Sequence, residues 1–239
     1  DAHVYSPSPA DAKMLGAARL VVANGLGFEG WINRLIKSSA AKADLVVASK
    51  GVKPRRAEDG HAHASSDPHA WQSVANAQLY VANIRDALTK ADPAGKAVYE
   101  ANAAAYLAKL DALDREVKAT IAAIPPEWRR VIVSHDAFGY FQDAYGVAFI
   151  APQGVSTEAE SSARDVARII AQIKRQKIPA IFLESISDPR MIERIARETG
   201  AKIGGTLYSD ALTPASGGAP TYIDMIRHNV RELAKALSG

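Results

Sequence analysis

The sequence predicts an α/β protein of two lobes that are joined by one long, rigid backbone helix. Short apolar segments typical of buried strands alternate with helical patterns in two blocks of the chain. Between the two blocks, a single helical pattern continues without interruption. The chain has 239 residues with 48% hydrophobic content, which is enough to bury a large core. Each lobe is therefore expected to contain a mainly parallel sheet flanked by helices.

The first block begins with two candidate strands and a helix between them. Apolar runs at residues 18–24 and 44–48 are bounded by Gly and charged residues, as expected for buried parallel strands. Residues 30–38 between them fit a helix. A loop rich in Gly, His and Ser follows over residues 51–68. Apolar residues spaced for one helical face then predict a helix over residues 73–90.

The connecting helix has the clearest pattern in the chain and is expected over residues 93–124. Its apolar residues repeat at intervals of three and four, the period of one helical face: Tyr99, Ala103, Tyr106, Leu110, Leu113, Val117, Ile121 and Ile124. Pro125 and Pro126 end it, since proline cannot continue a helix. Such a helix is on the order of 45 Å long, enough to run along both lobes.

The second block repeats the alternation of strands and helices. Strands are predicted near residues 131–134, 147–151, 180–183 and 202–207, and helices near residues 137–145, 161–176, 189–199 and 221–237. Helical crossovers between buried strands are typical of parallel sheets. We therefore expect an N-terminal lobe over residues 1–92, the connecting helix over 93–124 and a C-terminal lobe over 125–239.

Composition excludes several classes of protein. The 29 basic and 26 acidic residues are scattered along the chain, and their net charge of +3 is too weak and dispersed for a nucleic-acid-binding surface. No run approaches the roughly 18 apolar residues that a membrane span needs. The chain has no cysteine, which excludes disulfides and thiolate ligands. Any metal site must therefore use nitrogen and oxygen ligands.

Three histidines and one aspartate suggest a metal site of that kind. His3 and His69 lie in proline-containing turns, whereas His135 and Asp210 follow predicted strands. Because ligands bind beyond the carboxyl ends of strands in open α/β sheets, we expect the last two residues at one edge of the C-terminal sheet. Imidazole is a common zinc ligand, and three imidazoles with one carboxylate complete a tetrahedron. Drawn from both lobes, the four residues would place the metal between them.

Other polar residues have plainer interpretations. Asp67 and Asp136 stand beside two of the histidines and fit either helix caps and turns or hydrogen-bond partners of the ligands, and for Asp67 we favour the cap. His61 and His63 form either an accessory loop that captures metal or merely a polar loop. His228 lies on the last predicted helix and is expected to be solvated or partly buried.

At these residues the chain resembles the zinc and manganese solute-binding proteins of ABC transporters. Five segments carry the resemblance, in the order found in that family: residues 2–7 (AHVYSP), 24–31 (NGLGFEGW), 67–71 (DPHAW), 135–141 (HDAFGYF) and 208–212 (YSDAL). The resemblance implies that His3, His69, His135 and Asp210 are the metal ligands and that Glu184 lines the site. Manganese-type members have Glu where this chain has His135, and three imidazoles favour zinc.

The resemblance implies a non-catalytic, periplasmic receptor that captures Zn²⁺ with high affinity and delivers it to the membrane permease of an ABC transporter for import. The expected partners are the zinc ion and the permease, with a metallochaperone as a further candidate and no nucleic acid, and the protein is expected to be a monomer. A zinc-dependent hydrolase with an open coordination position remains the alternative, with Asp210 swung away and Glu184 as the base. A purely structural zinc is disfavoured because its ligands usually cluster at short spacings.

The beginning of the chain differs from the family pattern. Family members usually have a strand, a helix and a strand before the first histidine motif, whereas here the chain starts at Asp1, two residues ahead of His3. We therefore expect the N-terminal lobe to be incomplete at its start and the chain to be a processed or trimmed product.

Overall fold

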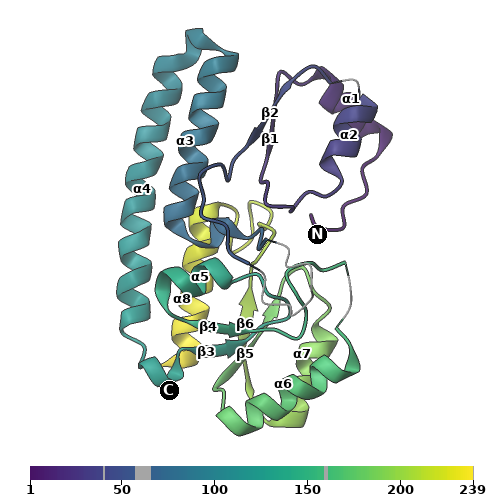
Figure 1. Ribbon diagram of the computed structural model, residues 1–239. Helices are drawn as coiled ribbons and strands as arrows, with labels where there is room; N and C mark the ends of the chain where they lie inside the picture. The colour runs from purple at the N-terminus through teal and green to yellow at the C-terminus, as the bar shows by residue number, and fades with distance from the viewer. Residues whose placement is uncertain (40, 57–65, 159–160, 239) are drawn as a thin grey trace.

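Two parallel sheets, one in each lobe, form the framework of the protein, as the computed structural model in Figure 1 shows. The structure describes residues 1–39, 41–56, 66–158 and 161–238. Helices flank both sheets, so the predicted α/β fold of two lobes is confirmed. None of the described helices combines the length and the apolar character that crossing a bilayer requires.

The sheet of the first lobe has two strands in the part of the chain that the structure describes. Strands β1 (Leu20–Ala23) and β2 (Asp44–Val47) pair in parallel, and helix α2 (Ile32–Ser39) lies in the crossover that a parallel pair requires. Helix α1 (Pro9–Ala17) precedes them and packs against α2. The hydroxyl of Ser8 caps α1 by accepting a hydrogen bond from its first turn.

A pair of long helices runs beside both lobes (Figure 1). Helix α3 (Val74–Ala91) packs against helix α4 (Lys96–Ala122), and the 3₁₀ turn Pro93–Gly95 connects them. Helix α4 has 27 residues and is therefore about 40 Å long. It begins three residues later and ends two residues earlier than the predicted helix, because the first residues form the 3₁₀ turn. The lobe boundaries on either side of it stay a prediction.

The sheet of the second lobe has four parallel strands in the order β4-β3-β5-β6. The strands are β3 (Arg130–Ile132), β4 (Ala148–Ile150), β5 (Ala180–Glu184) and β6 (Lys202–Leu207). The helices are α5 (Gly139–Tyr145), α6 (Ala163–Gln176), α7 (Pro189–Thr199) and α8 (Tyr222–Leu237). Elements therefore form where the alternating pattern predicted them, with ends that differ by at most two residues.

The central strands of this sheet are buried on both faces. Ala180 and Phe182 of β5 belong to a core shared with α4, α5 and α8, whereas Ile181 packs with α6 and α7 on the opposite face. In β3, Val131 belongs to the core shared with α4, α5 and α8, and Ile132 packs with α6 and α7. Because successive residues of a strand point to opposite faces, continuous apolar runs are what a sheet between two helical layers requires.

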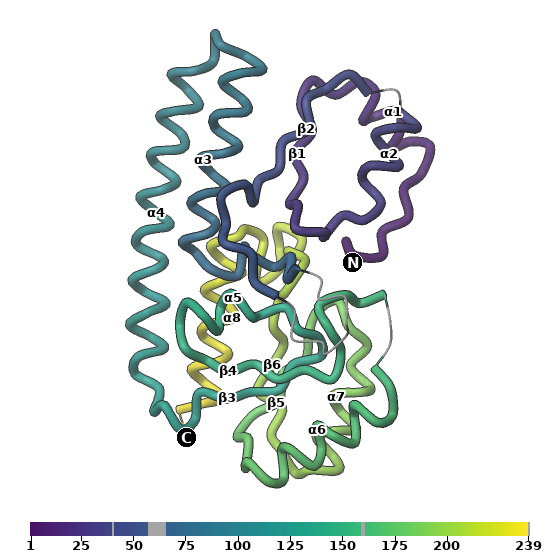
Figure 2. The backbone as a smooth tube through the Cα atoms, in the orientation of Figure 1, coloured from purple at the N-terminus to yellow at the C-terminus, as the bar shows by residue number. Residues whose placement is uncertain are grey.

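Residues 48–56 run from β2 to the second lobe, and residues 66–73 lead from the second lobe to α3, as Figure 2 shows. The backbone N–H of Arg55 donates a hydrogen bond of 2.9 Å to the hydroxyl of Tyr140 on α5. The N–H of Asp67 then donates to the carbonyl of Arg55 at 2.8 Å. This path brings the residues just before α3 against the second lobe.

Replacing Leu110 on α4 tests the importance of the core that α4 shares with the second lobe. Leu110 is 0% exposed, and Leu110→Ala leaves a cavity, so we expect the free energy of unfolding to fall by roughly 2–5 kcal/mol. Chemical denaturation of the metal-free protein measures this change. Val98→Ala on the same helix is the control, because Val98 is 61% exposed and a change within about 0.5 kcal/mol is expected. Equal effects of the two substitutions would contradict the packing described.

Candidate metal centre

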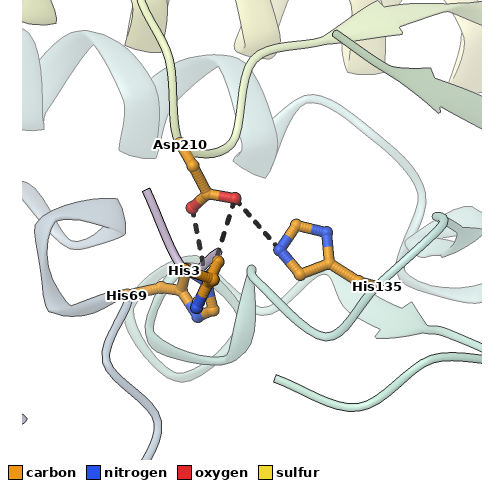
Figure 3. Close-up of side chains that lie close together, drawn as sticks. All are labelled: His3, His69, His135 and Asp210. Atoms are coloured by element: carbon orange, nitrogen blue, oxygen red, sulfur yellow. Dashed lines mark hydrogen bonds and ion pairs between the residues drawn. The ribbon is translucent and has the colours of Figure 1, made fainter. Parts of the chain in front are cut away.

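Four side chains from distant parts of the chain meet where the two lobes join. His3, His69, His135 and Asp210 each offer one ligand atom, and these atoms all lie within 4.8 Å of one another. Figure 3 shows the carboxylate of Asp210 facing the three imidazoles. The structure therefore brings together the four residues that the sequence predicted as ligands, although they span positions 3 to 210.

The ring of His69 is held by the carboxylate of Asp67. Oδ1 of Asp67 lies 2.8 Å from Nδ1 of His69 and accepts a second hydrogen bond from the His69 backbone N–H at 2.9 Å. The helix-cap interpretation of Asp67 was wrong, since the caps of the following 3₁₀ turn and of α3 are His69 and Ser73. Asp67 instead binds Nδ1 of His69, and this leaves Nε2 as the ring nitrogen that faces the other three residues.

His135 is held in the same way by Glu184. The two residues come from adjacent strands, since His135 follows β3 and Glu184 ends β5. Oε2 of Glu184 lies 2.6 Å from Nδ1 of His135, while Oε1 accepts the backbone N–H groups of Ser134 and His135 at 2.7 and 2.9 Å. Glu184 therefore stands behind His135 rather than among the four converging residues.

His3 is positioned by the first lobe. The indole Nε1 of Trp31 donates a hydrogen bond of 2.9 Å to the carbonyl of Ala2, which fixes the backbone beside His3. The ring of Phe28 meets the imidazole edge-on, with ring centroids 4.7 Å apart. Nε2 of His3 lies 3.1 Å from Nε2 of His69, so this ring also presents Nε2 to the centre of the group.

Asp210 lies on the loop after β6, and this loop is attached to the segment that carries His69. The side chains of Trp71 and Gln72 both donate hydrogen bonds of 2.9 Å to the carbonyl of Ser209. Both donors belong to the 3₁₀ turn Ala70–Gln72 that follows His69. Hydrogen bonds between their neighbours therefore help to set the separation between His69 and Asp210.

Burial and neighbouring charges shift the pKa values of three of these residues in different directions. Burial, opposed by Asp210, lowers the pKa of His3 to about 4. Burial also acts to lower the pKa of His135, but the carboxylates of Glu184 and Asp210 outweigh it and raise that pKa to about 10. Burial would raise the pKa of Asp210, but its hydrogen bond to His135 and the nearby imidazoles lower it to about 2.

Several of the donor separations are close to the edge of a coordination tetrahedron, and all lie within 4.8 Å. Zinc–ligand bonds of about 2.0–2.1 Å give a tetrahedron with edges of about 3.3 Å. Oδ1 of Asp210 lies 3.3 Å from Nε2 of His69, and Oδ2 lies 3.1 Å from Nε2 of His135 and 3.9 Å from Nε2 of His3. Oδ1 of Asp210 is buried and has no hydrogen-bond partner among the described residues, as expected for an atom that binds a metal.

The chain has three further histidines. His61 and His63 fall outside the described residues. His228 lies on α8, half-buried as expected, and its Nε2 is 2.9 Å from the carbonyl oxygen of Thr206. Sequence reasoning missed Arg55, which pairs with the Asp67 carboxylate at 3.5 Å. In the sequence Arg55 is only one member of a short basic cluster, so no local signal distinguished it.

The chain is similar to known metal-binding proteins. A family model described as "Zinc-uptake complex component A periplasmic" matches residues 1–236. The chain is 34% identical over 238 residues to the manganese-binding lipoprotein MntA of Halalkalibacterium halodurans, covering 99% of this chain and 77% of that protein. It is 35% identical over 233 residues to the iron-binding protein YfeA of Yersinia pestis, covering 98% and 75%. The solved structure of the periplasmic zinc binding protein TroA of Treponema pallidum matches with a TM-score of 0.92 and 32% identity, covering 99% of this chain and 87% of that one.

The raised pKa of His135 gives a direct test of the pair with Glu184. In the metal-free protein the ring of His135 should stay protonated through neutral pH and lose its proton only near pH 10. Because the folded pKa lies above the unfolded value of about 6.5, the stabilisation is complete below that value and is lost as pH rises through 10. Glu184→Gln removes the main opposing charge and should lower the pKa. NMR titration of the imidazole measures it.

Glu116→Gln is the matched control for this titration, since Glu116 pairs with Arg227 at the surface and does not contact the four residues. It should leave the titration of His135 unchanged. If His135 titrates at the same pH in Glu184→Gln as in the unmodified protein, the carboxylate does not hold the proton there.

Proposed function

We propose that this chain, which belongs to the family of periplasmic A components of zinc-uptake complexes, captures Zn²⁺ at His3, His69, His135 and Asp210 and delivers it to the permease of an ABC transporter. Family membership establishes the coarser part of this statement. The chain is an extracytoplasmic metal-binding receptor of an ABC transporter and is not an enzyme, so the hydrolase alternative is set aside. Its relatives are named for manganese, iron and zinc, so the choice of zinc is our proposal.

The donor set is the observation that carries the proposal of zinc. Three imidazole nitrogens and one carboxylate suit the four-coordinate preference of zinc, whereas manganese prefers oxygen ligands in an octahedron. The separations near the tetrahedral edge support the same choice. With His135 as the third nitrogen donor, the group has one carboxylate where an oxygen-rich site would have two.

The charge of the site favours a divalent ion. Asp67, Glu184 and Asp210 are carboxylates with side chains that are 0% exposed, and Arg55 is the guanidinium paired with one of them. Metal binding requires neutral imidazoles, including loss of the proton from His135, and these groups then carry two negative charges in a buried environment. A divalent cation cancels both charges, which matters because uncompensated buried charge is costly.

The proposed ligands come from both lobes. Binding of zinc therefore links the two lobes, and release of zinc to the permease requires the ligands to move apart. His3 is fixed by residues of the first lobe, whereas His135 and Asp210 follow strands of the second. The permease is the partner that this transport role requires. The monomeric state and loading by a metallochaperone stay predictions.

The identity of the metal is tested by metal content, geometry and mutation together. Purified protein should bind one zinc tightly, and its Co²⁺ form should show the intense visible bands of four-coordinate cobalt. A large excess of Mn²⁺ should raise the thermal midpoint far less than zinc, since stabilisation follows the affinity for the folded state. His135→Ala removes a ligand and should weaken zinc binding by more than the roughly 10–100-fold that loss of an outer partner costs. Competition with a chromophoric chelator measures this affinity.

His228→Gln is the matched control, because His228 lies on α8 and does not belong to the group of four. It should keep the affinity for zinc. Full zinc affinity in His135→Ala would remove His135 from the ligand set. Weak six-coordinate bands for Co²⁺, together with tight Mn²⁺ binding, would point to a manganese receptor instead.

His61 and His63 are proposed as an accessory, metal-capturing loop. The flanks of their loop are closed by a β-bridge between Arg56 and Ser66, so the loop leaves and returns just ahead of His69. Replacing both histidines by Ala should slow zinc loading or remove a weak second site while the tight site remains. Calorimetry gives the stoichiometry and stopped-flow mixing gives the loading rate. If both are unchanged, the two residues form only a polar loop.

A further inference from the structure

Arg55 lies directly behind the hydrogen bond that holds His69. Its Nη1 is 3.5 Å from Oδ2 of Asp67, and the other oxygen of that carboxylate binds the ring and the backbone of His69. The Asp67 side chain is 0% exposed and that of Arg55 is 12% exposed. A guanidinium, a carboxylate and an imidazole therefore form one continuous chain that ends at the metal site.

The rest of Arg55 is attached to the second lobe. Its Nε lies 3.2 Å from Oδ2 of Asp143 on α5, and its backbone N–H donates to the hydroxyl of Tyr140 on the same helix. Helix α5 begins four residues after His135. Arg55 thus connects the segment that precedes His69 with the segment that follows His135, and so influences the distance between two of the proposed ligands.

Gly139, the first residue of α5, leaves the space in which this ion pair lies. A Cβ atom at Gly139 would lie 2.6 Å from Oδ2 of Asp67 and closer still to Nη1 of Arg55. Any larger residue at this position would have to displace one of the two charged groups. The close approach of the α5 backbone therefore depends on glycine here and holds the pair in one arrangement.

A buried carboxylate is costly unless nearby cations or hydrogen-bond donors balance its charge. Oδ1 of Asp67 is engaged by His69, and Arg55 is the cation that faces Oδ2. Without that cation the Asp67 carboxylate would be a buried charge with no compensating partner on that side, and it would reorient or draw in water. Either response would move the ring of His69, which has no other hydrogen bond to its Nδ1 among the described residues.

We propose that Arg55 is a positioning residue of the metal site, which fixes the carboxylate of Asp67 and through it the imidazole of His69. The inference rests on the proposed function, because a displaced His69 matters to transport only if this ring binds the cargo. It assigns a role in metal binding to a residue that does not belong to the group of four.

The test compares Arg55→Gln, which removes the charge, with Arg55→Lys, which keeps it. Arg55→Gln should weaken zinc binding about tenfold, the lower end of what outer partners cost. It should also shift the visible bands of the Co²⁺ form, because cobalt reports the geometry of its ligands and a purely structural role would leave these bands unchanged. Arg55→Lys should restore most of the affinity. Chelator competition and absorption spectroscopy supply the two measurements.

Arg85→Gln is the control for loss of an arginine, since Arg85 forms an exposed ion pair with Asp86 on α3. It should change neither zinc affinity nor the cobalt bands. Zinc affinity and cobalt bands in Arg55→Gln that equal those of the unmodified protein would overturn the proposal. So would an Arg55→Lys variant that binds as weakly as Arg55→Gln.

Gly139→Ala gives an independent second test if Arg55→Gln does not fold. The added Cβ displaces the ion pair while both charged residues stay in the chain, so it should reproduce the weaker zinc binding and the shifted cobalt bands. Unchanged binding and bands in this variant would overturn the proposal. If the unmodified protein itself fails to bind one zinc tightly, the proposed function falls, and with it this inference. Tight zinc binding that neither Arg55→Gln nor Gly139→Ala weakens would refute the role of Arg55 and leave the proposed function standing.

Discussion

Three buried carboxylates set the constraint on which the rest of the structure depends. Asp67, Glu184 and Asp210 each lie against an imidazole of the site, and taking such charges out of water is unfavourable unless partners surround them. The fold supplies those partners from separate elements: backbone N–H groups after β3 for Glu184, Arg55 for Asp67 and the imidazoles for Asp210. The site is therefore organised by its outer hydrogen bonds before any cargo arrives.

The two lobes contribute to this arrangement differently. The second lobe has a sheet with helices on both faces, and the carboxyl ends of its strands present His135, Glu184 and Asp210 from a rigid base. The first lobe presents His3 from a two-stranded sheet. The segment of Asp67 and His69 joins the two parts, because hydrogen bonds fix it to the loop of Asp210 and to α5. Helix α4 packs against the core of the second lobe and keeps this junction in place.

Much of this could be predicted from local sequence patterns. Apolar runs located the strands, a repeat of three and four residues located α4, and the places of His135 and Asp210 after strands predicted that they would lie at one edge of a sheet. These predictions succeed because periodicity and strand ends are properties of short segments. The same reasoning placed the start of α4 too early, since it does not distinguish a 3₁₀ turn from the first turn of an α-helix.

What could not be predicted depends on contacts between distant segments. The sequence around Asp67 resembles a helix cap, and only the fold shows that its carboxylate binds the ring of His69. The partners of Arg55 include Asp143, which lies 88 positions later, and the room for them depends on Gly139. The spacing of residues in a single sequence does not predict these long-range contacts.

The order of the four converging residues along the chain also bears on synthesis. His3 is made before the other three residues and Asp210 after them, and the group contains both. A metal held by all four donors therefore cannot guide the folding of segments made before Asp210. A product that stops before β6 lacks Asp210, and a product cleaved after His3 lacks that imidazole, so each would offer only three of the four donors. Occupancy of the complete group would thus depend on an intact chain between these two positions.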